Sequence, residues 1–408
     1  MPFNRLMSGF RLRKPRETIA LIKDLALSKG ITRVTDTTCL DYFGVPVYAS
    51  IRPGAAAGSL CVNAGKGLKA IDAKVGAYME AMEFFYTEHG NSDLKVKNLK
   101  PGKLYENSPE DYILDFCPIM NTEIDLEEKI GCIEAINILN GQKSYVPAEL
   151  VFFPCPDNIS NHQYFGNDTN GLASGNNTSE ATLHGIHELL ERDIKSFHTI
   201  KDSSILLNYE TLPKEIRRII NKVKQMGYFI SIRYMPNQYN LPCFSANIGN
   251  VNDLNPVYIC GGYGCHLSRN IALNRAVTEC FQSRLSFIHG GRDDLEVRYK
   301  QFEGWSLAKK KKYAEQLISK IMSNESTKIS FQKIPDRSKN LDSLEGALER
   351  VTNLLQEHGF NKILRIVYTK KKDVVQVVRV IVPKMENFEE SKPKIGHRLK
   401  DHAAKVFK

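Results

Sequence analysis

Residues 168–193 read DTNGLASGNNTSEATLHGIHELLERD, a turn rich in glycine and asparagine that leads straight into a helix predicted over 179–198. Positions in a helix advance by about 100° per residue, so residues three or four apart share a face. One face of this helix is aliphatic, through Leu183, Ile186 and Leu190. The opposite face carries the ionisable side chains of Glu180, His184, His187, Glu188, Glu191 and Lys195. The helix is therefore amphipathic, and its polar side gathers carboxylates.

A crowded acidic face has two interpretations. Like charges three or four positions apart destabilise a helix by only about a few tenths of a kcal/mol, so a solvated surface tolerates them. Carboxylates that converge inside a protein instead need cationic side chains or metal ions as partners. A second helix, predicted over 70–89, favours the buried interpretation. Its glutamates, Glu80 and Glu83, lie on a helix that is apolar almost all round.

A third helix, predicted near 270–287, carries Arg275, Glu279 and Gln282 on one side, with Arg284 and Arg292 nearby. The three helices together supply several glutamates, an amide and several arginines. Oxygen-rich sites with several carboxylates favour hard cations such as Mg²⁺, and Mg²⁺ usually binds with phosphates that arginine can hold. The combination predicts a site for Mg²⁺ and a phosphorylated ligand.

Two glycine-bearing loops add groups that suit an anion. The loop NAGKG (63–67) presents Lys66, and ASGNN (173–177) places Asn176 at a helix N-terminus. The chain has no GxxxxGK[ST] motif, so an ordinary Walker ATPase is excluded.

A zinc site is the alternative for the acidic helix. The run HELLE (187–191) matches HExxH without its second histidine, so His187 and Glu191 could both bind a metal. Zinc would require further nitrogen or sulfur ligands. We expect His184 and His187 to be hydrogen-bonded helix residues rather than ligands.

Strands alternate with long helices along the whole chain, which predicts an α/β fold with mixed sheets. A helix is expected over 15–29, a solvated helix over 303–322, and two late strands in NKILRIVYTK and DVVQVVRVIVP. No linker is rich enough in Pro, Gly or Ser to divide the chain. We therefore expect one domain over 1–385 and a basic C-terminal tail over 386–408. A glycine-bearing loop followed by a glutamate-bearing helix occurs near 65–83 and again near 172–191, a weak internal duplication.

The composition excludes several classes of protein. The 408 residues carry a formal charge of +10, but the basic residues are spread and no basic motif is interleaved with aromatics, which argues against nucleic acid as the ligand. No apolar run approaches the roughly 18 residues of a membrane span. The nine cysteines stand singly, which is typical of reduced thiols in the cytoplasm. We expect a cytoplasmic protein that binds an anionic ligand or an acidic partner.

Four ordered blocks carry a resemblance to a known family. They read GITRVTDTTCLDYFGVPVYASIRP (30–53), GKGLKAIDAKVGAYMEAMEFF (65–85), the stretch 168–193 quoted above, and ALNRAVTECFQSRLSFIHGGRDDL (272–295). In this order and composition the chain resembles YcaO-domain proteins along nearly its full length. The resemblance implies an unusual ATP-grasping α/β fold whose nucleotide-binding blocks here span 60–90, 170–198 and 268–295.

The resemblance also implies cofactors and roles for residues. The cofactors are ATP and Mg²⁺, and members phosphorylate the oxygen of a peptide backbone amide to give a thioamide or an azoline ring. Metal and phosphate binding would involve Glu80, Glu83, Glu180, Glu188, Glu191 and Glu279. Nucleotide or phosphate would be oriented by Lys66, Asn176, Arg192, Arg275, Gln282 and Arg284. A catalytic residue beyond these is not indicated.

Two departures from the family pattern bear on the reaction. The family often has serine where this chain has Gly76, so one polar contact is missing. Many ring-forming members end in a proline-rich tail that reaches the active site, whereas this chain ends IGHRLKDHAAKVFK. The missing tail favours members that work beside a TfuA-type partner and form thioamides on a peptide or protein.

Two alternatives remain open. The first is an azoline-forming cyclodehydratase that works with a separate E1-like protein, and the second is a non-catalytic ATP-binding accessory protein. Homodimerisation is expected from the resemblance alone.

Overall fold

Three main sheets organise the chain in the computed structural model, which describes residues 2–101, 104, 109–160, 163–250, 252, 255–323, 327–390 and 393–407. The antiparallel N-terminal sheet has the order β3 (Arg33–Asp36), β4 (Val47–Ile51), β5 (Val62–Lys66). The second has the order β13 (Cys260–Cys265), β12 (Cys243–Asn250), β11 (Tyr228–Tyr234), β10 (Ile205–Leu207), β14 (Lys328–Ile329). The third has the order β6 (Lys97–Leu99), β7 (Ile130–Asn137), β15 (Leu364–Val367), β16 (Gln376–Ile381), β9 (Leu172–Gly175), with β8 (Lys143–Pro147) paired to β7.

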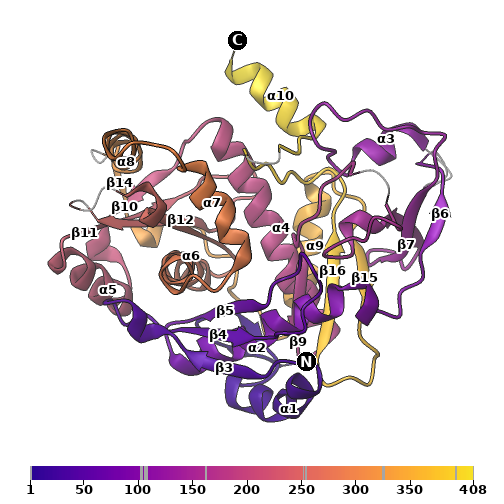
Figure 1. The fold of residues 1–408 in the computed structure, drawn as a ribbon, viewed down its shortest axis with the longest axis horizontal. Helices are drawn as coiled ribbons and strands as arrows, with labels where there is room; N and C mark the ends of the chain where they lie inside the picture. Colours follow the sequence, from indigo (N-terminus) through magenta and orange to yellow (C-terminus); the bar gives the residue numbers. More distant parts are fainter. Residues whose placement is uncertain are drawn as a thin grey trace.

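The helices lie around and between these sheets (Figure 1). The long ones are α1 (Pro15–Ser28), α2 (Ala70–Thr87), α4 (Thr178–Ile200), α6 (Arg269–His289), α8 (Leu307–Ile321) and α9 (Leu344–Glu357). Shorter ones are α3 (Pro109–Leu114), α5 (Lys214–Gln225), α7 (Glu296–Gln301) and α10 (His397–Val406). In Figure 1, α6 is seen end-on in the left half of the molecule, with α4 to its right and α2 below it. The predicted α/β class with mixed sheets is confirmed.

One arrangement occurs three times, each time as a strand followed by a turn and a long helix: β5–α2, β9–α4 and β13–α6. In the first unit a Cβ on Gly65 would lie 2.1 Å from the backbone of Ala73 and of Ala77, so only glycine lets α2 pack this closely on β5. Gly264 makes the same kind of contact between β13 and α6, where an added Cβ would lie 2.1 Å from the Ala272 carbonyl oxygen. The duplication expected at two places thus has a third copy. The three units aim three polar helix faces at one centre.

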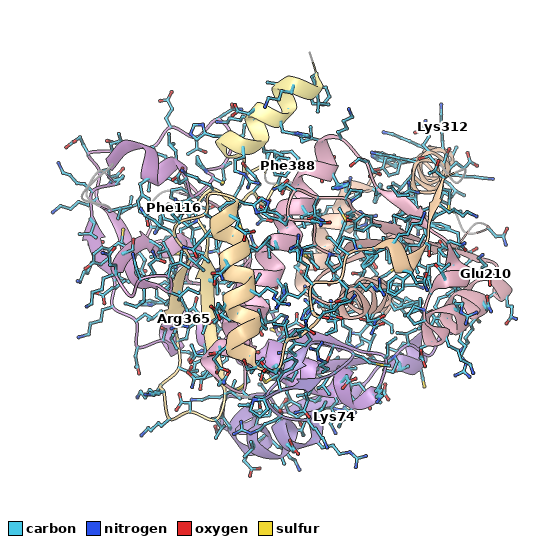
Figure 2. All side chains as sticks on the ribbon, turned by 180° about the vertical axis from the view of Figure 1, so that it is seen from behind. Lys74, Phe116, Glu210, Lys312, Arg365 and Phe388 are labelled. Atoms are coloured by element: carbon cyan, nitrogen blue, oxygen red, sulfur yellow. The ribbon has the colours of Figure 1, made fainter. Side chains whose placement is uncertain are left out.

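Apolar side chains fill the interfaces between the sheets and the helices. Buried aliphatic and aromatic side chains join α2 to the third sheet, α4 and α9 to the strands beside them, and α5 and α6 to the second sheet. Charged side chains such as Glu210 and Lys312 stand on the outside (Figure 2). Among the described residues, no helix is long and apolar enough to cross a bilayer.

Some elements differ from those expected. The predicted helices over 15–29, 70–89, 179–198 and 270–287 match α1, α2, α4 and α6 to within a few residues. The solvated helix expected over 303–322 begins only at Leu307, and it buries Ala314 against Phe229 of β11 and Ile259, which precedes β13.

Several further elements lie outside the predictions. Among them are the helices α3, α5, α7 and α9. Another is an N-terminal hairpin, β1 (Asn4–Arg5) with β2 (Phe10–Arg11). The segment expected to be a tail also contains a helix, α10, which packs against α4.

Candidate functional site

A cavity of about 480 Å³ lies where α2, α4 and α6 meet the end of β5. Of the twelve residues predicted for the site, eleven line it: Lys66, Glu80, Glu83, Asn176, Glu180, Glu188, Glu191, Arg192, Arg275, Glu279 and Gln282. The three helix faces that were predicted separately therefore meet in one place.

The glutamates of α2 are short of positive charge. The Ser174 hydroxyl donates to Glu83 across 2.5 Å. Burial, together with the neighbouring carboxylates Glu80 and Glu188, nevertheless raises the pKa of Glu83 to about 8. Burial also raises the pKa of Glu80, although the Arg292 guanidinium lies 4.0 Å away. These carboxylates fit a site that gains cations from its ligand.

The glutamates of α4 lie in a similar environment. The Cys265 amide on β13 donates to Glu191 across 3.1 Å, and the Gly171 amide donates to Glu188 across 3.3 Å. Burial raises the pKa of both carboxylates. Arg192 lies 3.8 Å from Glu191. Strands on two sides of α4 therefore orient its acidic face into the cavity.

Glu279 of α6 is paired more closely with a cation than Glu80, Glu83, Glu188 and Glu191 are. It forms an ion pair with Lys66, and the Tyr263 amide donates to it across 3.2 Å. Burial would raise the pKa of Glu279, but the charges of Lys66 and Arg192 outweigh it and hold the pKa at about 2. The pair closes the cavity between β5 and α6.

Glu180 fastens the N-terminal hairpin over the cavity. Its carboxylate accepts from Arg11 at 3.1 Å, from the Leu12 amide at 2.8 Å, and from Asn176 at 3.1 and 3.2 Å. Asn176 in turn accepts from the Thr18 hydroxyl at 2.9 Å. To ligate a metal, Glu180 would have to give up some of these donors, so its role as a metal ligand stays a prediction.

The hairpin brings residues that were not predicted for the site. Arg11 and Arg13 both line the cavity, as do Met7 and Ser8. The Asn274 side chain donates to the Met7 carbonyl at 3.3 Å and ties the hairpin to α6. The basic N-terminal sequence was the available signal, but its two-residue strands have no periodicity to reveal them.

Gln282 and Arg284 of α6 lie in different surroundings. The Gln282 amide donates to the Ala64 carbonyl and keeps its place at the cavity wall. Arg284 does not line the cavity. It is buried, donates to Asp41 at 3.0 and 3.4 Å, and stacks on the rings of Phe43 and Tyr228. The structure therefore does not bring Arg284 to the cavity with the other predicted residues, because Asp41 holds its guanidinium away from it.

The histidines of α4 behave as expected for hydrogen-bonded residues. His187 is buried, accepts from the Leu267 amide at 3.3 Å, and stacks on His266 with ring centroids 4.2 Å apart. His184 lies 3.1 Å from the Arg275 guanidinium. Burial lowers the pKa of His184 and His187, so both rings are neutral. A neutral His184 accepts from Arg275 and turns it toward the cavity.

The donor set of the cavity suits Mg²⁺. Within the described part of the chain, no group of three His, Cys, Asp or Glu side chains is arranged to hold a metal ion by itself. Mg²⁺ does not need one, because it usually binds through one or two carboxylates, waters and the phosphates of a ligand. The raised pKa values of Glu80, Glu83, Glu188 and Glu191 show carboxylates that divalent cations would stabilise in their charged form.

The family follows from the sequence. A family model described as YcaO cyclodehydratase, ATP- and Mg²⁺-binding, matches residues 64–386. The chain belongs to the YcaO family. It is 30% identical over 391 residues to an uncharacterized protein of Methanothermobacter thermautotrophicus, covering 95% of this chain and 98% of that one. It is 29% identical over 383 residues to a Rhizobium leguminosarum protein named for its place in a tfuA 3′ region, covering 91% and 87%.

The fold agrees with this membership. The structure of a YcaO protein from Methanopyrus kandleri bound with AMPPCP and Mg²⁺ superimposes with a TM-score of 0.76 at 21% identity, covering 97% of this chain and 98% of that one. The YcaO family model itself is described as ATP- and Mg²⁺-binding, so ATP and Mg²⁺ are the cofactors of this domain.

One departure from the family pattern has a structural reason. Gly76 of α2 faces Gly65 of β5, and a Cβ at Gly76 would lie 3.3 Å from the Gly65 Cα. A serine there would have to fit against the backbone of β5. The missing serine therefore matches a tight strand–helix contact.

Proposed function

We propose that this YcaO protein uses Mg²⁺ and ATP to phosphorylate the oxygen of a backbone amide in a peptide or protein. With a sulfur donor and a TfuA-like partner, the amide would become a thioamide. The observation that carries the proposal is the meeting of carboxylates from three helices with Lys66, Arg192 and Arg275 around one cavity. Such a site binds a metal–triphosphate.

The residues of the cavity divide into two sets. Glu80 and Glu83 of α2, with Glu188 and Glu191 of α4, would hold Mg²⁺, which when bound neutralises and bridges the phosphates. Lys66 and Glu279 form a pair that can open when a phosphate arrives, leaving Lys66 for the phosphate and Glu279 for the cation. These side chains position the reactants and need supply no covalent step.

Arginines complete the phosphate site. Arg192 and Arg275 come from α4 and α6, and Arg11 and Arg13 come from the hairpin above. Arginine holds phosphate oxygens with two donors in a fixed plane, so four of them fix the orientation of the γ-phosphoryl group. The hairpin also covers the cavity, which keeps water from the phosphoryl group.

The reaction balances as follows. A sulfur nucleophile adds to the amide carbon, and the oxygen takes the γ-phosphoryl group as ADP leaves. Inorganic phosphate then leaves with that oxygen and the sulfur gives up its proton, so that C=S replaces C=O. One observation favours sulfur: a relative from Rhizobium leguminosarum is named for its place in a tfuA 3′ region.

The test is product mass. The full-length protein is incubated with ATP, Mg²⁺, sulfide, a TfuA-like protein and candidate peptides, and the peptides are analysed by mass spectrometry. Replacement of one oxygen by sulfur supports the proposal. ATP turnover without any change in peptide mass under every partner would overturn it in favour of an accessory ATP-binding role.

Azoline formation is the second candidate, because the matching family model is described as a cyclodehydratase. In that reaction a Cys, Ser or Thr side chain of the peptide replaces the external sulfur nucleophile, and the peptide loses one water. The same experiment with an E1-like protein in place of the TfuA-like one distinguishes the two products.

A further inference from the structure

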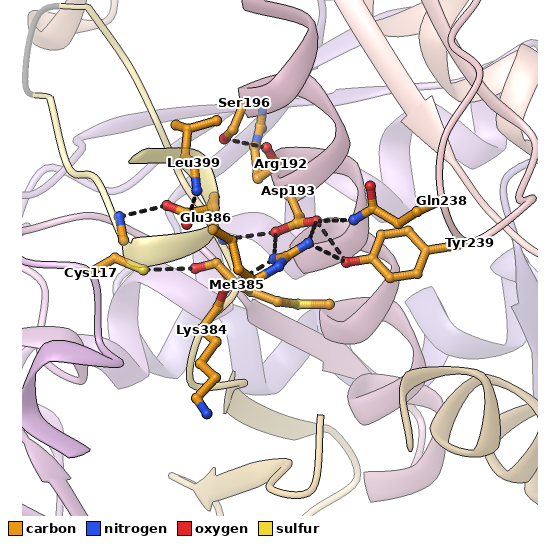
Figure 3. A network of polar contacts seen from close by, with 12 residues as sticks. Cys117, Arg192, Asp193, Ser196, Gln238, Tyr239, Lys384, Met385, Glu386 and Leu399 are labelled. Atoms are coloured by element: carbon orange, nitrogen blue, oxygen red, sulfur yellow. Dashed lines mark hydrogen bonds and ion pairs between the residues drawn. The ribbon is translucent and has the colours of Figure 1, made fainter. Parts of the chain in front are cut away.

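The C-terminal segment, residues 385–390 and 393–407, packs against α4, and Figure 3 shows its polar contacts around Asp193 of that helix. The point of attachment is Asp193, which follows Arg192 in the sequence and is fully buried. Arg398 of α10 donates to the two Asp193 oxygens at 2.6 and 3.2 Å, and the Glu386 amide donates to it at 2.8 Å. The Tyr239 hydroxyl donates to the same carboxylate at 2.7 Å. Asp193 therefore joins the end of the chain to the turn of α4 that bears Glu191 and Arg192.

The start of α10 is fixed by a second buried carboxylate. The Glu386 carboxylate accepts from the backbone amides of Gly396 at 2.7 Å and Leu399 at 2.9 Å. The first N–H groups of a helix have no acceptor within the helix, so this carboxylate supplies one. Arg398 also lies over the rings of Phe197 and Phe360. These contacts hold the Arg398 guanidinium at one place and orientation.

A further contact reaches Arg192 itself. The Phe388 amide donates to the Ser196 hydroxyl at 2.9 Å, and that hydroxyl donates to the Arg192 carbonyl at 2.7 Å. The C-terminal segment is thus linked to the backbone of Arg192 and to the side chain of the next residue.

The same segment holds a second wall of the cavity. Lys394 forms an ion pair with Asp168, and the side-chain amide of Asn387 donates to Asp168 at 3.1 Å. Asp168 precedes Thr169, which lines the cavity. Two charge pairs from one short segment therefore end on residues that are each next in sequence to a residue of the cavity wall.

The geometry points to a positioning role for this segment. Arg398–Asp193 and Lys394–Asp168 act as a clasp that orients Arg192 and the loop at Thr169 toward the nucleotide. The inference rests on the proposed ATP site, and it deepens it by assigning Asp193, Arg398, Asp168 and Lys394 as positioning residues. None of the four is placed in contact with the nucleotide. Outer residues of this kind orient the groups that bind a ligand, and their loss typically costs about 10–100-fold in affinity at metal sites.

The experiment measures binding of Mg²⁺–AMPPCP to the full-length protein by calorimetry. We expect Arg398→Ala to weaken binding by about tenfold, and Arg398→Lys to restore part of the loss because it keeps the charge. Lys400→Ala is the matched control, since Lys400 is exposed on the same helix. Lys394→Ala tests the second pair.

A purely structural role is separated by a double-mutant cycle with Arg192→Lys. If the clasp acts through Arg192, Arg398→Ala should cost less in that background than in the wild type. If the losses in binding free energy of Arg398→Ala and Arg192→Lys are fully additive, the inference is overturned. It is also overturned if Arg398→Ala and Lys394→Ala both bind Mg²⁺–AMPPCP with unchanged affinity. Should Arg398→Ala fail to fold, Arg398→Lys and Lys394→Ala decide the matter. A wild type that binds no nucleotide refutes the ATP site, whereas one that binds nucleotide but modifies no peptide refutes only the proposed reaction.

Discussion

The Ser174 hydroxyl at the end of β9 donates to the Glu83 carboxylate on α2 across 2.5 Å, and so joins two of the three strand–helix units at the cavity. Burial raises the pKa of this carboxyl to about 8, with Glu80 and Glu188 adding to the rise. Near neutral pH the free protein therefore keeps a proton on Glu83. The hydrogen bond between Ser174 and Glu83 therefore joins two strand–helix units at a carboxyl group whose pKa is raised by burial.

Binding of Mg²⁺ and nucleotide should release this proton. A folded-state pKa above the ordinary carboxyl value means that Glu83 stabilises the free fold at low pH, and that this contribution is lost as the pH rises through about 8. A cation favours the ionised form, so Mg²⁺–nucleotide affinity should rise with pH up to about 8 and then level off. Calorimetry in buffers of different ionisation enthalpy at pH 7 measures the proton released. Glu83→Gln should abolish most of it, and an identical release in that variant contradicts the assignment.

Substitutions of Glu191 and of Glu180 should have different effects on the Mg²⁺ dependence of nucleotide binding. Among the residues that the structure describes, the cation nearest to Glu191 is Arg192 at 3.8 Å, whereas Glu180 is held by Arg11, the Leu12 amide and Asn176. We expect Glu191→Gln to raise the Mg²⁺ concentration needed for nucleotide binding by about 10–100-fold. Glu180→Gln should instead weaken nucleotide binding at every Mg²⁺ concentration, because it loosens the hairpin. Mg²⁺ titrations at fixed nucleotide compare the two; equal shifts would make Glu180 a metal ligand as well.

The main helices and their site residues could be predicted because their signals are local. In α2, α4 and α6 the carboxylates recur at helical spacing, and the same spacing that forms the helix also brings them to one face. Arg284 shows the limit of grouping residues by proximity in sequence. It lies two positions after Gln282, and residues two apart on a helix do not share a face, so Gln282 reaches the cavity and Arg284 reaches Asp41.

The rest of the site depends on contacts between distant parts of the chain. Arg11 reaches Glu180 across 169 positions, and Arg398 reaches Asp193 across 205. The two-residue strands of the hairpin are too short to show a periodic pattern, and the ten-residue α10 gains its position from the surface that it packs on. The sequence of one chain therefore indicates candidate residues for cation binding, but it does not indicate which segments pack over them.

Restoring the family's serine at position 76 should destabilise this chain. A side chain there meets the Gly65 Cα at 3.3 Å, and the neighbouring backbone is fixed in β5. We expect Gly76→Ser to lower the free energy of unfolding by about 1–3 kcal/mol, the usual cost of overpacking. Gly65→Ala should cost more, since its Cβ would lie 2.1 Å from the Ala77 amide. Gly54→Ala, where nothing lies within 4 Å, is the control. Urea unfolding measures all three, and a stable Gly65→Ala would contradict the close packing of α2 on β5.

Arg284 and Arg275 lie on the same helix and should separate stability from binding. Arg284→Ala removes one partner of a buried ion pair and leaves Asp41 uncompensated. We expect it to lower the free energy of unfolding by about 3–5 kcal/mol. Its affinity for Mg²⁺–AMPPCP, measured well below the melting temperature, should change by less than about twofold, or 0.4 kcal/mol.

Arg275→Ala should do the reverse, because Arg275 lines the cavity and is held there by the neutral His184. A hydrogen bond to a charged group contributes about 1.5–3 kcal/mol, so its loss should weaken nucleotide binding by roughly tenfold or more. Thermal unfolding and nucleotide titration of both variants give the comparison. If Arg284→Ala lost affinity as strongly as Arg275→Ala while remaining folded, Arg284 would act on the nucleotide through the helix, and the boundary drawn here between cavity and core would be wrong.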